Sequence, residues 1–146
     1  MNEQILVPSL GMALTGAVPV DGVTAGHWQA AAKGQFSVPT CDECGTNYWP
    51  VAHACYKCRS SRWSWQPVPG TGKVFTYTWC DAPTHPTEVL ENLVVIELDG
   101  TSGEPVRVPG WMEGVDKETL VCGLPVEAVF ETIAEGLAVP HWKPRA

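Results

Sequence analysis

Four of the six cysteines lie within residues 41–58, in two Cys-x-x-Cys pairs formed by Cys41 with Cys44 and by Cys55 with Cys58. Zinc prefers four ligands in a tetrahedron, and thiolates at about 2.3 Å from the metal suit it well. Each pair places two sulfurs on one side of an ion, and Gly45 permits a tight bend after the first pair. Four thiolates leave no position for water. The spacing therefore predicts a structural zinc site and not a catalytic one.

The compartment supports this interpretation of the cysteines. Residues 1–20 lack the basic start of a signal peptide and contain Pro8 and Pro19, so we expect a reducing, cytoplasmic environment. Two disulfides or a redox Cys-x-x-Cys are the alternatives that the spacing leaves open, and iron could occupy the same four sulfurs. Cys80 and Cys122 have no partners at ligand spacing, and we expect them to be small buried apolar side chains.

The elements that position these cysteines are short. An Ala-rich helix is predicted at residues 27–34, with Gly34 at its end. Alternating or apolar runs predict strands, and Gly/Pro-rich stretches separate them. We expect strands within 35–40, 59–67, 73–79, 93–98, 105–112 and 124–133, with a last strand or extended tail at 137–144.

These elements predict a mainly β protein: an N-terminal helix and a rubredoxin-like zinc ribbon, followed by a five-stranded OB-fold barrel. Periodicity alone leaves a small sandwich as an alternative. We expect three regions: an extended arm at residues 1–25, the helix and ribbon at 26–68, and the barrel with a C-terminal tail at 69–146.

Charge argues against two classes of partner. The net charge is −7, and residues 81–135 contain twelve acidic and two basic residues, whereas residues 33–73 contain five basic and two acidic ones. A nucleic-acid backbone and an anionic membrane surface both require a basic face. No run approaches the roughly 20 apolar residues of a membrane span. We therefore expect neither nucleic acid nor membrane as a partner.

The order of motifs resembles a known family. The helix contains His27-Trp28, the cysteine ribbon follows, and the barrel contains GTGKVFTYTW (70–79), GLPVEAVF (123–130) and PHWKP (140–144). Together these motifs are similar to the small zinc-ribbon/OB-fold proteins associated with acyl-CoA metabolism, long called a domain of unknown function. The resemblance covers residues 25–144. It implies that zinc is bound by the four cysteines at 41, 44, 55 and 58.

The resemblance also implies a partner. Members of the family pair with a thiolase-like or lipid-transfer-protein-like subunit that holds the catalytic residues, as in thiolases, steroid side-chain aldolases and phloroglucinol acyltransferases. We therefore expect a non-catalytic, zinc-binding small subunit of a hetero-oligomer that makes or breaks carbon–carbon bonds in acyl-CoA substrates. It would stabilise the large subunit and shape its acyl-CoA site. No catalytic residue can be transferred to this chain.

Candidate contacts follow from residue type. Lys57, Arg59 and Arg62 are basic residues of the ribbon that could meet CoA phosphates or a partner. Trp28 and Trp49, with His85, are candidate partner-interface residues because tryptophan is enriched at interfaces. The alternatives are a free-standing acyl-CoA-binding protein and, less favoured by charge, an OB-fold nucleic-acid-binding protein.

Overall fold

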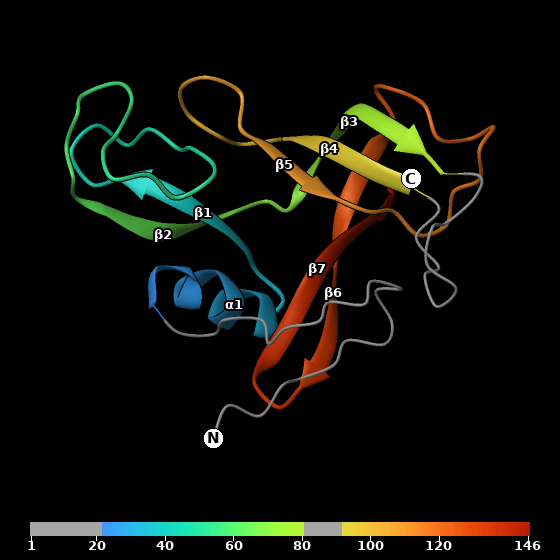
Figure 1. The fold of residues 1–146 in the computed structure, drawn as a ribbon, viewed down its shortest axis with the longest axis horizontal. Helices are drawn as coiled ribbons and strands as arrows, with labels where there is room; N and C mark the ends of the chain where they lie inside the picture. The colour runs from blue at the N-terminus through green and yellow to red at the C-terminus, as the bar shows by residue number, and fades with distance from the viewer. Residues whose placement is uncertain (1–21, 81–91) are drawn as a thin grey trace.

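A two-stranded sheet that bears the cysteines and a five-stranded sheet that forms the barrel lie next to each other (Figure 1). The structure is a computed structural model that describes residues 22–80 and 92–146. A short 3-10 turn, η2, precedes one helix and seven strands. These are η2 (Gly22–Thr24), α1 (Ala25–Ala32), β1 (Phe36–Cys41), β2 (Trp63–Val68), β3 (Thr71–Trp79), β4 (Asn92–Leu98), β5 (Arg107–Gly110), β6 (Pro125–Ala134) and β7 (Leu137–Pro144).

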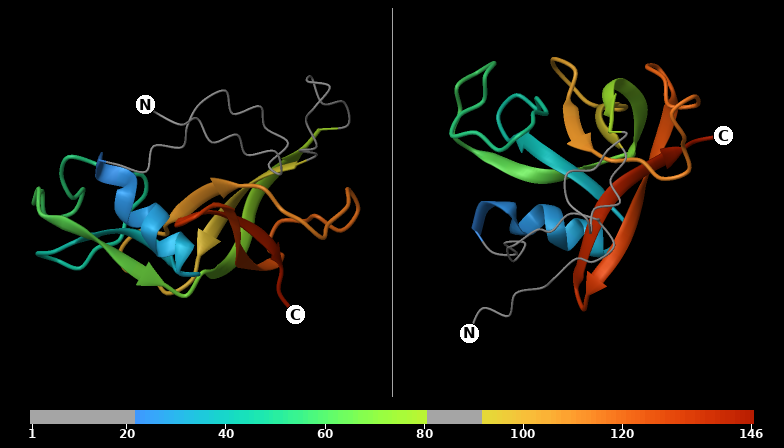
Figure 2. Two further views of the ribbon diagram at one scale, coloured as in Figure 1. Left: turned by 90° about the horizontal axis from the view of Figure 1, so that it is seen from below. Right: turned by 45° about the vertical axis from the view of Figure 1, so that its right-hand side comes forward.

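The helix α1 begins and ends two residues earlier than the predicted range 27–34, but Gly34 caps its end as the sequence predicts. The Gly34 N–H donates to the Ala31 carbonyl and the Gln35 N–H to the Ala30 carbonyl, each at 2.9 Å. Gly34 has a φ of 74°, the left-handed conformation that this paired C-terminal motif requires. Figure 1 and Figure 2 show α1 against β1 and β7, between the ribbon and the β6–β7 hairpin. The helix thus joins the two sheets.

The ribbon is built from β1 and β2, which pair antiparallel from Phe36↔Val68 to Cys41↔Trp63. Side chains alternate between the two faces of a strand, so Trp63 and Trp65 share one face. Their ring centroids lie 5.6 Å apart. The hairpin places its first cysteine at the end of a strand, where a rigid backbone holds it.

The barrel strands follow the order β5-β4-β3-β6-β7. A parallel bridge between Met112 and Trp142 joins the two ends of this order. The Trp142 N–H donates to the Trp111 carbonyl at 3.0 Å, and the Glu113 N–H donates to the Trp142 carbonyl at 2.9 Å. The five strands therefore curl into the predicted OB-fold barrel. Residues 137–144 form its last strand, not an extended tail.

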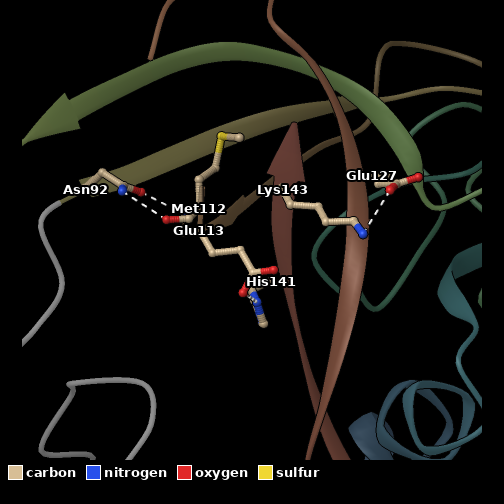
Figure 3. Close-up of polar contacts among 6 residues, drawn as sticks. All are labelled: Asn92, Met112, Glu113, Glu127, His141 and Lys143. Carbon is tan, nitrogen blue, oxygen red and sulfur yellow. Dashed lines mark hydrogen bonds and ion pairs between the residues drawn. The ribbon is translucent and has the colours of Figure 1, made fainter. Parts of the chain in front are cut away.

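Side chains strengthen this closure (Figure 3). The Met112 N–H donates to Asn92 Oδ1 at 2.8 Å, and Asn92 Nδ2 donates to the Met112 carbonyl at 3.1 Å. On β7, His141 Nε2 lies 2.9 Å from Glu113 Oε2, and its ring stacks on Trp111 with centroids 4.1 Å apart. These contacts fix the segment after β5 against the start of β4 and against β7.

One core serves both sheets. Barrel residues such as Val74, Ile96 and Val126 form a single buried cluster with Phe36 and Val38 of the ribbon strand β1. Ile96, Val38 and Val126 are each 0% exposed. The ribbon is therefore packed onto the barrel by apolar contacts, and its position does not depend on a flexible linker.

The expectation for the two unpaired cysteines is wrong. Cys80 and Cys122 are both exposed. Cys80 follows β3 residues 75–78, which are themselves exposed because β6 pairs with β3 only at Thr71–Lys73. Cys122 lies in the connection that leads to β6. No second layer formed by residues 22–80 or 92–146 covers either position, so a small apolar side chain is not needed there.

Replacing Asn92 by alanine should lower the free energy of unfolding by about 1–3 kcal/mol, because it leaves the Met112 N–H and carbonyl unpaired at a buried site. Asn92 is 6% exposed. Urea denaturation measures the change. Thr132→Ala, at an exposed position of β6, is the matched control and should stay within about 0.5 kcal/mol of the parent. Equal unfolding midpoints for the Asn92 variant and the control would disprove the role of this side chain in barrel closure.

Candidate metal centre and ribbon surface

The two Cys-x-x-Cys turns have the same backbone geometry. In each turn the N–H of the first cysteine, Cys41 or Cys55, donates to the carbonyl five residues later, at 2.9 and 2.8 Å. The N–H four residues later, of Gly45 or Arg59, returns to the carbonyl of that first cysteine, at 3.0 and 2.9 Å. Gly45 has a φ of 73° and Arg59 a φ of 67°. Arg59 thus occupies the left-handed position that glycine occupies in the first turn.

The four sulfurs are spaced for one metal ion. The Sγ atoms of the four cysteines lie within 4.8 Å of one another. Cys41 Sγ is 3.5 Å from Cys58 Sγ, and Cys44 Sγ is 3.7 Å from Cys55 Sγ. A tetrahedral ion with bonds of about 2.3 Å separates its sulfurs by about 3.8 Å, whereas a disulfide joins them at about 2.05 Å. The arrangement fits a four-thiolate zinc site.

The pKa values of the Cys44 and Cys58 thiols are shifted in opposite directions. The Cys44 sulfur lies 3.1 Å from Thr46 Oγ1. Hydrogen bonds from the Thr46 side chain and backbone lower the pKa of Cys44 to about 6. At Cys58 a backbone hydrogen bond from Ser60 lowers the pKa, but the Cys41 thiol, burial and the other thiols raise it to about 12. The hydrogen bonds from Thr46 therefore favour the thiolate form of Cys44.

The cysteine turns are fastened to the barrel. The Asn47 N–H donates to the Ser102 carbonyl at 2.9 Å, and the Ser102 N–H donates to Asn47 Oδ1 at 2.7 Å. From the second turn, the Tyr56 hydroxyl accepts the Glu104 N–H at 2.8 Å. Both turns therefore contact the β4–β5 connection. A change at the metal centre would reach the barrel through these bonds.

The three basic ribbon residues differ in their surroundings. Lys57, Arg59 and Arg62 are all exposed. Arg62 forms an ion pair with Glu43. Within residues 22–80 and 92–146, the Lys57 and Arg59 side chains form no ion pair. The positive charge that is available to a ligand therefore lies mainly on the second cysteine turn.

The structure describes two of the three candidate interface residues. Trp28 and Trp49 are partly buried, and both line a cavity between α1, the ribbon and the barrel. His85 lies outside the described residues, as do most of the N-terminal arm and the loop after β3. Contact of any of these with a partner stays a prediction. None of the seven tryptophans is fully exposed, and Trp142 is only 1% exposed.

The sequence did not predict that His27 lines this cavity. His27 is 6% exposed, and its ring centroid lies 5.0 Å from that of Trp28, 5.3 Å from Trp49 and 5.6 Å from Trp65. One signal could have indicated its burial, because His27 and Ala31 are four residues apart and share the buried face of α1. The convergence of three tryptophans from α1 and the ribbon had no local signal.

Two family models match consecutive parts of the chain. Residues 28–64 match the rubredoxin-like zinc ribbon domain of ChsH2, and residues 65–131 match the C-terminal OB-fold domain of ChsH2. A DUF35 domain-containing scaffold protein of Methanocaldococcus jannaschii is 34% identical over 98 residues, which are 65% of this chain and 67% of that relative. The chain belongs to the ChsH2/DUF35 family. The resemblance that the sequence motifs indicate is confirmed, as are the zinc-ribbon and OB-fold assignments.

Other similar proteins extend the comparison. A probable enoyl-CoA hydratase alpha subunit of Thermomonospora curvata is 25% identical over 118 residues, and the match spans 80% of this chain but 36% of that protein. The structure of an Ltp2-ChsH2(DUF35) aldolase contains a similar chain, with a TM-score of 0.73 and 23% identity over 87% of this chain and 98% of that one. A DUF35 protein of unknown function from Sulfolobus solfataricus has a TM-score of 0.54 and 14% identity, over 87% and 89% of the two chains. These similarities establish the shared fold.

The described residues contain no helix that is long and apolar enough to cross a membrane.

Proposed function

We propose that this chain is the zinc-binding small subunit of a complex whose larger, thiolase-like or lipid-transfer-protein-like subunit makes or breaks carbon–carbon bonds in acyl-CoA substrates. The observation on which this depends most is the match of both the ribbon and the barrel to the two ChsH2 domains, over residues 28–131. The similar chain in the solved aldolase structure and the scaffold name of the archaeal relative support it.

The four cysteine thiolates would hold the zinc, and the ion would cross-link the two turns of the ribbon. A closed coordination sphere of four thiolates has no open position for substrate, so its contribution is to folding. The hydrogen bonds of Asn47 and Tyr56 then transmit this order to the β4–β5 connection. In this proposal the small subunit supplies shape and charge, and the partner supplies the catalytic residues.

Arg59 is the residue on this surface with the strongest case for ligand contact. Its left-handed backbone costs about 1–2 kcal/mol for a residue with a Cβ, and the first turn has glycine at the same place. Backbone strain of this kind is a reason to look for a role of the side chain. The Arg59 guanidinium and the Lys57 ammonium lie on the same turn, and neither has a carboxylate partner among the described residues. We propose that the Arg59 guanidinium and the Lys57 ammonium bind the phosphates of CoA.

Arg59→Gly tests this assignment, because it relieves the strained backbone while it removes the guanidinium. In the purified complex, KM for the acyl-CoA should rise about tenfold with little change in kcat, the pattern of lost ground-state binding. Arg62→Ala is the control and should change KM much less, since Arg62 is already paired with Glu43. An unchanged KM for Arg59→Gly, with the complex assembled, would remove the CoA contact from the proposal but leave the partner assignment standing.

A further inference from the structure

A cavity of about 450 Å³ lies where α1, the ribbon and the barrel meet. This volume is within the range of about 300–1,000 Å³ that is typical of small-molecule sites. Its described walls are mainly aromatic and aliphatic, and Thr24 and His27 also line it. The walls include Trp28 of α1, Trp49 and Trp65 of the ribbon, and Val108, Pro140 and Trp142 of the barrel. All three parts of the fold are needed to form it, and none of the basic ribbon residues lines it.

Among the lining residues that the structure describes, His27 is the single ionisable side chain. Its Nδ1 lies 3.2 Å from the carbonyl oxygen of Ser37. A carbonyl can only accept a hydrogen bond, so Nδ1 must hold the proton of the neutral ring and donate it. Burial lowers the pKa of His27, and the hydrogen bond to Ser37 raises it by less. The ring is therefore neutral, and its other nitrogen, Nε2, has a free lone pair.

The Nε2 atom of His27 has no hydrogen-bond partner among the described residues. His27 makes no other hydrogen bond within the part of the chain that the structure describes. Trp28 Nε1 is a buried polar atom that is closed off from solvent and has no hydrogen-bond partner. His27 Nε2 is not closed off in this way. Because His27 lines the cavity and its ring otherwise packs against aromatic rings, we take the cavity to be the space that Nε2 faces. A hydrogen-bond acceptor thus lies in an apolar chamber.

From this geometry we infer that the cavity binds a small neutral aromatic compound that bears a hydroxyl group, a phenol in the broad sense. The ring would lie among the tryptophans, and the hydroxyl would donate to His27 Nε2. A hydrocarbon would leave Nε2 unpaired, which carries a cost at a buried site. A carboxylate would lose its hydrating water and face the lone pair of His27 Nε2, which cannot donate a hydrogen bond to it. An ammonium group would find no carboxylate among residues 22–80 and 92–146, since no Asp or Glu of these residues lines the cavity.

The inference does not rest on the proposed partner, and the zinc-loaded full-length chain can test it. Naphthol, naphthyl methyl ether and naphthoate are titrated near neutral pH and followed by calorimetry. Naphthol should bind about tenfold more tightly than its methyl ether, which has the same rings but no donor. Naphthoate should bind more weakly than naphthol. In the long-range proton–nitrogen NMR spectrum, the His27 Nε2 resonance should shift with naphthol and not with the ether.

Two variants separate the hydrogen bond from the cavity. His27→Phe keeps an aromatic ring but removes Nε2. The affinity of this variant for naphthol should therefore fall to its affinity for the methyl ether. Val51→Phe adds a ring to the cavity wall and should abolish binding of both compounds. If His27→Phe does not fold, the Nε2 resonance of the parent still decides the role of His27. Equal binding of naphthol and its ether to the parent, absence of binding, or unchanged binding by Val51→Phe would overturn the inference.

Discussion

Replacing Cys41 by serine should release the zinc and unfold the ribbon. Apparent zinc-binding free energies of about 10–16 kcal/mol in small zinc-finger peptides are also folding free energies, because the site does not exist in the unfolded chain. Cys41 is 2% exposed, and its backbone forms the first turn through two hydrogen bonds. Serine has no thiolate to complete the four-sulfur sphere. We expect the loss to extend to the β4–β5 connection through Asn47 and Tyr56.

Metal analysis of the purified parent should find one zinc per chain, and the Cys41→Ser variant should retain only a small fraction of this. Hydrogen exchange should quicken in residues 36–68 and in residues 99–106, with less change in β6 and β7. Cys122→Ser is the matched control, because it also removes a thiol but lies outside the cluster and is exposed. Full zinc content in Cys41→Ser, or a metal-free parent with these cysteines in disulfides, would contradict the four-thiolate site.

Replacing Trp142 by alanine should have the second-largest effect on stability. This side chain is 1% exposed, belongs to the shared core, and lies 5.3 Å from the Phe36 ring between centroids. Its backbone also closes the barrel against Trp111 and Glu113. A buried Trp→Ala change leaves a large cavity and costs about 3–5 kcal/mol. We expect the loss of the Trp142 side chain to separate the ribbon from the barrel. We also expect it to lower the stability of each of the two parts.

Urea denaturation followed by circular dichroism measures this loss. Tyr77→Ala is the control, because this residue also lies on a barrel strand but is 38% exposed, and its loss should be under about 1 kcal/mol. Exposed hydrophobic surface in Trp142→Ala should appear as increased binding of a hydrophobic dye. If both variants unfold at the same midpoint as the parent, Trp142 does not join the ribbon to the barrel as described.

Local patterns predicted much of the fold. The alternation at residues 73–79, the apolar run at 93–98 and the Gly34 helix end each depend on nearest neighbours, and the structure has an element at each place. Cysteine spacing indicated a metal cluster because two sulfurs three residues apart need only one turn to share an ion. The order of motifs then specified the family.

Long-range features could not be predicted in this way. The barrel closes through a parallel bridge between Met112 and Trp142 and through the Asn92 side chain, which are far apart in sequence. Exposure of Cys80 and Cys122 depends on where β6 stops pairing with β3, and no local pattern fixes that point. The environment of His27 likewise requires three separate segments to converge. Strand pairing and helix docking determine all three.

Affinity purification of this chain from its native cells tests the central claim most directly. The parent chain should elute with a stoichiometric thiolase-like or lipid-transfer-protein-like subunit, and the complex should make or break a carbon–carbon bond in an acyl-CoA that neither subunit converts alone. Cys41→Ser should lose this partner, and Cys122→Ser should keep it. Elution of the parent as a single chain without such a subunit, at native concentration, would contradict the account.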